Sequence, residues 1–165
     1  MKRLINEPFH SMHRVMDMLC LNFGQTCRNE TISIGNRVIS QRIFPVYSLH
    51  IQVQWRFIYQ GTILLGSRDI YKPFSNDIDV DMWDYNPTNR PDCESSLFDV
   101  ASRQVSEALT GHYVTDATVT QFGDVQLKFS NDYVFEVFIP ASYKDEEWRL
   151  IDVIGNEHLV FHDTN

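Results

Sequence analysis

The 165-residue chain is poor in cysteine, glycine and proline, and it has no long apolar run. Its three cysteines are an odd number without CxxC spacing, which argues against a disulfide framework and against a zinc site. Only 7 Gly and 6 Pro are present, which excludes collagen-like and low-complexity architectures. No stretch approaches the roughly 18 apolar residues of a membrane span, and the N-terminus lacks the apolar segment of a signal peptide. We therefore expect a cytoplasmic protein without a membrane partner.

Apolar and aromatic side chains are plentiful by comparison. Hydrophobic residues make up 43% of the chain and aromatic residues 13%, a composition that excludes disorder as the dominant state. A chain of this length buries roughly 70% of the surface that its unfolded form exposes, which is enough for a core without metal or disulfide bonds. We therefore expect a single domain over residues 1–165.

Charge is distributed unevenly along the chain. Residues 1–75 carry nine Lys and Arg against four Asp and Glu, whereas residues 76–165 carry five against eighteen, and the net charge is -8. The acidic half would repel phosphates, so the pattern argues against nucleic acid as a partner. An acidic surface would accelerate association with a basic protein. The simpler interpretation is that the negative charge keeps the protein soluble.

Two segments have the apolar spacing of helices. The second predicted helix covers residues 95–109, with Ser95 or Ser96 as the N-cap and Gly111 after its end. The first predicted helix runs into residues 18–23. Apolar side chains are too dense there for a single helix face, and in the alternative interpretation these residues form a strand. The first predicted helix follows Pro8 and has apolar side chains that recur on one face: Phe9, Met12, Val15, Met16 and Leu19.

The remaining patterns predict strands. Apolar and polar side chains alternate from Tyr47 to Ile58, which is typical of one strand with a buried face and a solvated face. Gln60-Gly61 then turns the chain into a second strand over residues 62–67, and residues 72–94 are expected to form a loop. Shorter strand patterns cover 31–34, 37–40, 117–122, 124–129, 133–139, 148–151 and 158–161. Together they predict an α+β fold, an antiparallel sheet of about six to eight strands covered on one face by two helices.

Two histidine spacings could suggest a metal site. His10, His13 and Asp17 would share one face of the first predicted helix, but a solvated polar face explains the same spacing. His158 and His162 are four residues apart, and on the expected strand they would lie roughly 13 Å apart, too far to share one ion. We therefore expect no histidine-bound metal.

Residues 77–81 begin like a calcium-binding loop. The loop requires a glycine at its sixth position and a bidentate glutamate at its twelfth, where this chain has Met82 and Thr88. Motifs of nucleophilic catalysis, phosphate-binding loops and zinc hydrolases are also missing from the sequence. We expect no metal, no organic cofactor and no catalytic residue, and therefore a binding protein rather than an enzyme.

Residues 77–99 are the best candidate for a binding segment. They carry seven carboxylates against one arginine, together with two aromatic residues. Interfaces combine aromatic anchors with a charged rim; a solvated loop explains the carboxylates equally well, but leaves an exposed Trp83 without a role. As an extended segment it would place the first three aspartates on one face. The residues expected to contact a partner are Asp77, Asp79, Asp81, Trp83, Asp84, Tyr85, Asp92 and Glu94.

Several segments together resemble a family of small, largely uncharacterised bacterial proteins. The resemblance runs from about Arg14 to Phe161, and the acidic segment 76–94 is not part of it. It rests on Arg14-Val15-Met16-Asp17-Met18, Phe23-Gly24, Leu49-His50-Ile51-Gln52 with Trp55-Arg56, Gly66-Ser67-Arg68-Asp69-Ile70-Tyr71, Leu97-Phe98-Asp99, Phe135-Glu136-Val137-Phe138 and Trp148-Arg149-Leu150.

Proteins of this size and kind are similar to the immunity proteins encoded beside bacterial polymorphic or contact-dependent toxins. The resemblance implies a protein that neutralises a cognate toxin by direct contact, without chemistry of its own. Its partner would be the C-terminal domain of the toxin, and many such domains are basic because they act on nucleic acid. The alternative is a small-molecule-binding or enzymatic domain with a cleft near Arg56, Asp69 and Trp148. The sequence leaves the oligomeric state open.

Overall fold

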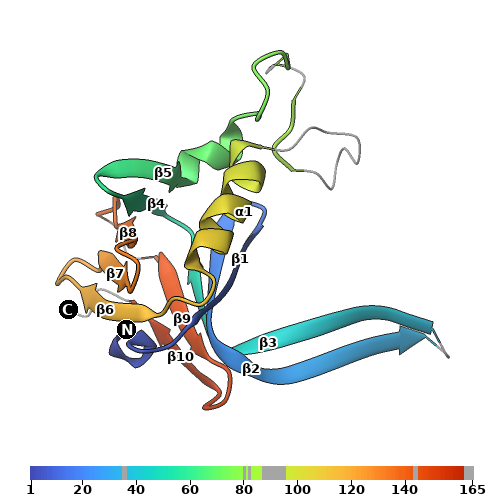
Figure 1. The fold of residues 1–165 in the computed structure, drawn as a ribbon, viewed down its shortest axis with the longest axis vertical. Coiled ribbons are helices and arrows are strands. Elements are labelled where there is room, and N and C mark those ends of the chain that lie inside the picture. The colour runs from blue at the N-terminus through green and yellow to red at the C-terminus, as the bar shows by residue number, and fades with distance from the viewer. Residues whose placement is uncertain (35–36, 80, 82, 87–95, 143–144, 162–165) are drawn as a thin grey trace.

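The computed structural model describes all residues except 35–36, 80, 82, 87–95, 143–144 and 162–165, and the side chains of residues 29–43 also lie outside the description (Figure 1). Within this part of the chain, strands dominate. The elements are η1 (Lys2–Leu4), β1 (Phe9–Val15), β2 (Met18–Ile34), β3 (Arg37–Ile51), β4 (Gln54–Tyr59), β5 (Thr62–Gly66), η2 (Ser67–Tyr71), α1 (Leu97–Leu109), β6 (Val114–Val119), β7 (Val125–Phe129), β8 (Val134–Phe138), β9 (Trp148–Asp152) and β10 (Glu157–Val160).

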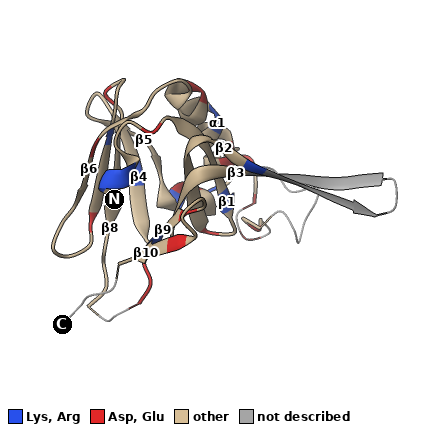
Figure 2. Cartoon of the chain, turned by 90° about the horizontal axis from the view of Figure 1, so that it is seen from below, with Lys and Arg blue, Asp and Glu red and all other residues tan. Residues whose placement is uncertain are grey.

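The strands form two antiparallel sheets of five strands each, which lie on opposite sides of the core (Figure 2). Sheet 1 has the order β1-β2-β3-β9-β10, and sheet 2 has the order β5-β4-β8-β7-β6. The helix α1 packs against β1 of sheet 1, against β5 of sheet 2 and against η2, which follows β5 (Figure 1). The predicted antiparallel pairing is confirmed, but two helices covering one sheet is wrong, because the described part of the chain is mostly β with one α-helix.

The first predicted helix is wrong, because residues 9–15 form β1 and residues 18–23 begin β2. The pairing of β1 with β2 shifts between Phe9 and Ser11, so one extra residue enters β1 at this point. This bulge brings Phe9 and Met12 to the same face although they are three residues apart, a spacing that imitates a helix. The alternative strand interpretation of residues 18–23 is confirmed.

The alternation from Tyr47 to Ile58 belongs to two strands rather than one. β3 ends at Ile51 in sheet 1, and β4 begins at Gln54 in sheet 2. The alternation continues across the break because the inner faces of both sheets contact the same core, where Leu49, Ile51 and Phe57 are fully buried. The polar face was expected to be solvated, yet Ser48 on that face is only 9% exposed.

The other strands and the second helix agree with the sequence patterns apart from their bounds. The hairpin of β4 and β5, the meander of β6, β7 and β8, and the pair of β9 and β10 are all present. Ser96 caps α1 by accepting a hydrogen bond from the N–H of Asp99 at 3.1 Å. The predicted hairpin over 31–40 is part of the long β2–β3 hairpin, which extends beyond its neighbours in sheet 1, and its turn lies outside the described residues.

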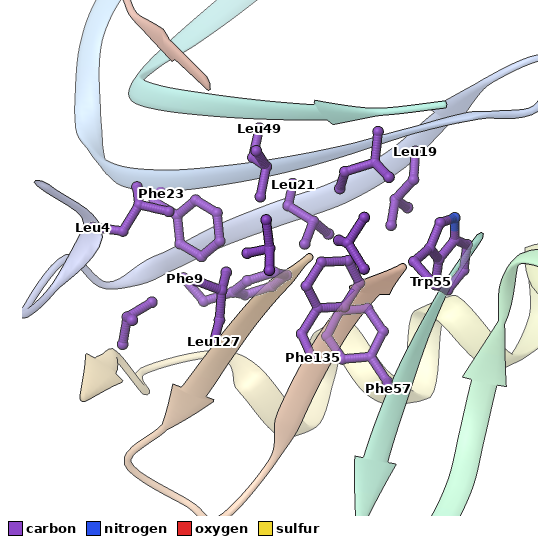
Figure 3. Packing of buried hydrophobic residues seen from close by; sticks show 14 of the residues in the cluster. Leu4, Phe9, Leu19, Leu21, Phe23, Leu49, Trp55, Phe57, Leu127 and Phe135 are labelled. Carbon is purple, nitrogen blue, oxygen red and sulfur yellow. The ribbon is translucent and has the colours of Figure 1, made fainter. Parts of the chain in front are cut away.

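The core lies between the two sheets and is rich in aromatic rings (Figure 3). One group joins Phe9 and Phe23 of sheet 1 to Phe129 of sheet 2, with ring centroids 6.3 to 6.5 Å apart. A second group surrounds Trp55 and includes Phe98 of α1 at 5.9 Å. The helix is therefore part of the core. Among the residues that the structure describes, no helix has the length and apolar character that crossing a membrane requires.

Candidate partner-binding surface

Arg14 connects the end of β1 with the start of α1 and with the acidic segment. Its side chain is 7% exposed and points to the inner side of sheet 1, because Arg14 pairs with the core residue Leu19. The guanidinium donates two hydrogen bonds to the carboxylate of Asp99, at 2.8 and 2.9 Å. It also donates to the backbone carbonyls of Tyr85 at 2.9 Å and of Met16 at 2.8 Å. One buried cation therefore holds three separate segments together.

The carboxylate of Asp99 has two structural roles. Besides binding Arg14, it accepts a hydrogen bond from the backbone N–H of Ser96 at 3.1 Å and completes a capping box at the start of α1. Burial acts to raise the pKa of Asp99, but the hydrogen bonds from Arg14 and Ser96 outweigh it, and the pKa lies below its ordinary value. Asp99 is therefore ionised at neutral pH and belongs to the scaffold rather than to the exposed carboxylates of the acidic segment.

The turn between β1 and β2 has a strained backbone. Val15 pairs with Met18, so Met16 and Asp17 form the turn, and Met16 has a φ of 56°, in the left-handed region that disfavours side chains with a Cβ. The carboxylate of Asp17 accepts a hydrogen bond from the hydroxyl of Tyr71 at 3.2 Å. Burial raises the pKa of Tyr71, and Asp17 raises it further, so the hydroxyl stays protonated. Strain of this kind is frequent at functional sites.

Exposed apolar side chains gather around this turn. Val15 and Met16 are each 53% exposed, Tyr71 is 51% exposed, and the Tyr71 ring lies edge-on to that of Tyr85 with centroids 5.0 Å apart. We call Val15, Met16, Asp17, Tyr71 and Tyr85 the turn patch. Phe74, three residues after Tyr71, is 55% exposed as well. The turn patch combines apolar side chains with a carboxylate and adjoins the acidic segment, as a protein interface does.

A hollow of about 420 Å³ adjoins the turn patch and shares Asp17 and Tyr71 with it. Gln52 and Arg68 also line it, as does Glu147, whose pKa is raised by burial and by Asp145. No sequence pattern points to a role of Asp17, Tyr71 or Glu147 in binding a protein partner, and Asp17 was a candidate only for a metal site. Asp17 and Tyr71 do fall within segments that carry the family resemblance, and that common membership was the available signal.

The structure places the predicted contact residues in three groups. Asp77, Asp79 and Asp81 are exposed, and no ion pair found among the described residues involves them. The chain bends and turns over residues 74–78 instead of running extended, and Asp79 accepts a hydrogen bond from the N–H of Asp81 at 3.1 Å. Trp83, Asp84 and Tyr85 are half-buried, so the expectation of an exposed Trp83 is wrong. Asp92 and Glu94, like Val80 and Met82, lie outside the described residues.

The three residues of the alternative cleft each have a partner of their own. Arg56 lies on the outer face of sheet 2 and pairs with Glu136 at 2.6 Å. Asp69 accepts a hydrogen bond from the N–H of Gly66 at 2.8 Å at the start of η2. Trp148 is buried on the inner face of sheet 1, and its indole N–H donates to a backbone carbonyl at 2.8 Å. Arg56 and Trp148 therefore lie on opposite sides of the core.

The histidine patterns do not form a metal site in the described part of the chain. His13 lies on strand β1 and Asp17 in the turn that follows it, so the two do not share a helix face. His158 lies on β10, in agreement with the strand predicted there, and His162 lies outside the described residues. No group of three or more His, Cys, Asp or Glu side chains among the residues described is arranged to hold a metal ion.

A comparison with protein-family models, curated proteins and solved structures found no match.

Proposed function

We propose that this protein is an immunity-type binding protein, which neutralises a cognate bacterial toxin in the cytoplasm by direct contact. Contact is made through the turn patch and the exposed carboxylates Asp77, Asp79 and Asp81, which belong to the acidic segment that reaches the patch at Tyr85. The observation that carries the proposal is the gathering of exposed apolar side chains at a strained turn, directly beside an acidic segment. Interfaces have this composition, with apolar and aromatic anchors surrounded by a charged rim.

The scaffold supports this role because it holds the surface in place before a partner arrives. Arg14 ties the turn, the acidic segment and α1 to one another with four hydrogen bonds. A surface that is ordered before association loses less conformational freedom on binding, which strengthens affinity.

The charges indicate the chemistry of the partner. Asp77, Asp79 and Asp81 have no cation beside them among the described residues, and Asp17 and Glu147 line the hollow next to the turn patch. A basic toxin domain would place lysine or arginine side chains against these carboxylates. Opposite charges of this kind mainly accelerate association, and apolar anchors mainly slow dissociation.

The test is binding to the product of the gene immediately upstream, measured as association and dissociation rates at two salt concentrations. The double variant Asp77→Asn/Asp81→Asn keeps the side-chain shape and removes two charges. We expect its association rate to fall roughly threefold or more at low salt and little at high salt. The control Glu107→Gln/Asp132→Asn removes two exposed charges elsewhere, on α1 and after β7, and is expected to change the rates far less.

The apolar part of the surface is tested by Met16→Ala. We expect dissociation to become roughly fivefold faster or more, because an interface anchor is lost. Ile154→Ala is the matched control, since Ile154 is 69% exposed and lies in the turn between β9 and β10. Equal rates for Met16→Ala, Ile154→Ala and the unchanged protein would remove the turn patch from the interface. A genome without a toxin-like neighbour, or a neighbour that does not bind, would refute the immunity function itself.

A further inference from the structure

The outer face of sheet 1, which points away from the core, carries a hollow of about 430 Å³. The strand register forms its floor, because Asn22 of β2 lies beside Ser48 of β3, and His50 lies one pair further along the same face. The base of the β2–β3 hairpin forms one wall, and the turn after β9 forms the other. The hollow shares no residue with the turn patch and requires its own explanation.

The floor of this hollow is polar and buried. Asn22 and Ser48 are 7% and 9% exposed, although they lie on the face opposite the core. Ser48 Oγ donates to Asn22 Oδ1 at 2.7 Å, and Asn22 Nδ2 donates to Ser11 Oγ at 2.9 Å. Buried polar groups cost stability unless they are hydrogen-bonded, and a satisfied network of this kind is rigid. A rigid polar floor beneath an open hollow favours ligand recognition over simple packing.

Three of the residues that line the hollow, Arg28, His13 and His50, carry hydrogen-bond donors. Arg28 lies over the ring of Phe44, with its guanidinium carbon 4.3 Å from the ring centroid. His13 and His50 line the same hollow from β1 and β3. A guanidinium and two imidazoles suit a ligand group that accepts hydrogen bonds and carries negative charge.

The carboxylate that lines the opposite wall has hydrogen-bond partners of its own. Asp152 accepts a hydrogen bond from Arg3 at 3.1 Å and another from the N–H of Gly155 at 2.8 Å. Arg3 also pairs with Glu157 at 2.6 Å, so it balances part of the charge of Asp152. An anion bound beside Arg28 would meet less repulsion from Asp152 than from an unpaired carboxylate.

The thiol beneath the hollow does not provide chemistry. Cys20 lies beside His13 and His50 in the strand register, but it is 1% exposed, and burial raises its pKa to about 11. The thiolate is the reactive form, so a thiol with this pKa is inert at neutral pH. Cys20 therefore does not make the hollow a nucleophilic centre.

We propose that this hollow binds a small organic oxyanion, in which a carboxylate or a phosphate is attached to an apolar or planar body. The anionic group would contact Arg28 and His50, and the body would lie against Phe44, Pro45 and Ile151, which form apolar parts of the lining. The volume falls within the range of about 300–1,000 Å³ that small-molecule pockets occupy.

The histidines make binding depend on pH. Burial lowers the pKa of His50. The charges of His13, Arg149 and His158 lower this pKa further, whereas Glu146 raises it. Loss of solvent also lowers the pKa of His13. A bound anion favours the protonated imidazole, so affinity for a ligand whose own charge is constant should rise as pH falls through the lowered pKa values.

Calorimetric titration of the full chain with three probes tests the proposal. Benzoate and phenyl phosphate present the two anionic groups on one ring, and benzamide is a neutral probe of similar shape. We expect saturable binding of at least one anion, tighter at about pH 5.5 than at pH 7.5 for benzoate, and much weaker binding of benzamide. The anion with the higher affinity identifies the group that the site prefers. Absence of saturable binding by both anions, or equal binding of benzamide, would overturn the proposal.

Two variants locate the site. Arg28→Gln removes the charge at the wall, and we expect roughly tenfold weaker binding of the preferred anion. His50→Gln should remove much of the pH dependence. Arg103→Gln and His112→Gln are the matched controls on α1 and before β6, and both should leave binding unchanged. An effect of the controls as large as that of Arg28→Gln would also contradict the assignment of the anion site to this hollow. The double variant Asp77→Asn/Asp81→Asn should bind the probes as the unchanged protein does.

Discussion

Replacement of Arg14 with methionine should destabilise the protein by about 2–4 kcal/mol. Methionine replaces the unbranched apolar stem of arginine but removes both hydrogen bonds to Asp99 and both to backbone carbonyls. Removing one member of a buried ion pair costs about 3–5 kcal/mol, because the other charge is left without a partner. The Asp99 side chain is 28% exposed, so solvent screens part of that cost, and the lower end of the range applies.

Urea denaturation of the unchanged protein and of Arg14→Met measures this difference at neutral pH. Lys128→Met is the matched control, because Lys128 and Asp116 form an exposed pair at 3.4 Å with side chains 50% and 46% exposed. Exposed pairs contribute about 0–1 kcal/mol, so the control should change the free energy of unfolding little. In the double variant Arg14→Met/Asp99→Asn part of the loss should be recovered, since no uncompensated carboxylate remains.

The pH dependence gives a second, independent check. The pKa of Asp99 is lowered in the folded protein, so its contribution to stability is fully present above the unfolded pKa and disappears as pH falls through the folded value. The difference between the unchanged protein and Arg14→Met should therefore shrink below about pH 4. A difference no larger than that of Lys128→Met, or one that stays constant down to acidic pH, would refute the role assigned to Arg14.

Three further substitutions test the backbone and the core. Gly123→Ala should lower the free energy of unfolding by about 3 kcal/mol or more, because the added Cβ would lie 2.3 Å from an aromatic ring atom. Gly111→Ala is the control, since Gly111 has a similarly positive φ but nothing within 4 Å of the added Cβ, and it should cost only about 1–2 kcal/mol. Thermal or urea unfolding measures both. Leu49→Ala should cost about 2–5 kcal/mol in the same assay, because Leu49 is fully buried. Val53→Ala should cost clearly less, because Val53 is half-buried where the chain leaves sheet 1. Equal costs would contradict the break between β3 and β4. Met16→Asn should raise the free energy of unfolding by up to about 1 kcal/mol, because asparagine tolerates the left-handed backbone better, and a clear loss of stability would show that the turn is not strained.

The candidate surface was only partly accessible to reasoning from the sequence. The abundance of carboxylates and aromatic residues over 77–99 pointed to this segment, and the exposure of Asp77, Asp79 and Asp81 agrees with it. The contribution of the turn at Met16 and Asp17 was missed, because residues 9–19 were assigned to a helix. Contacts such as that between Asp17 and Tyr71 join positions 54 residues apart, and no local sequence pattern predicts them.

Local chemistry by itself indicated most strand positions and a helix over 95–109 capped at Ser95 or Ser96, because alternation, turn residues and capping act over a few neighbouring residues. The structure has this helix at Leu97–Leu109 with Ser96 as its cap. Only the tertiary structure decided how these elements share a core. The alternation from Tyr47 to Ile58 is the same for one strand or for two in facing sheets, since both bury every second side chain. The spacing of Phe9 and Met12 is likewise the same for a helix or a bulged strand, and the pairing of β1 with β2 decided between them.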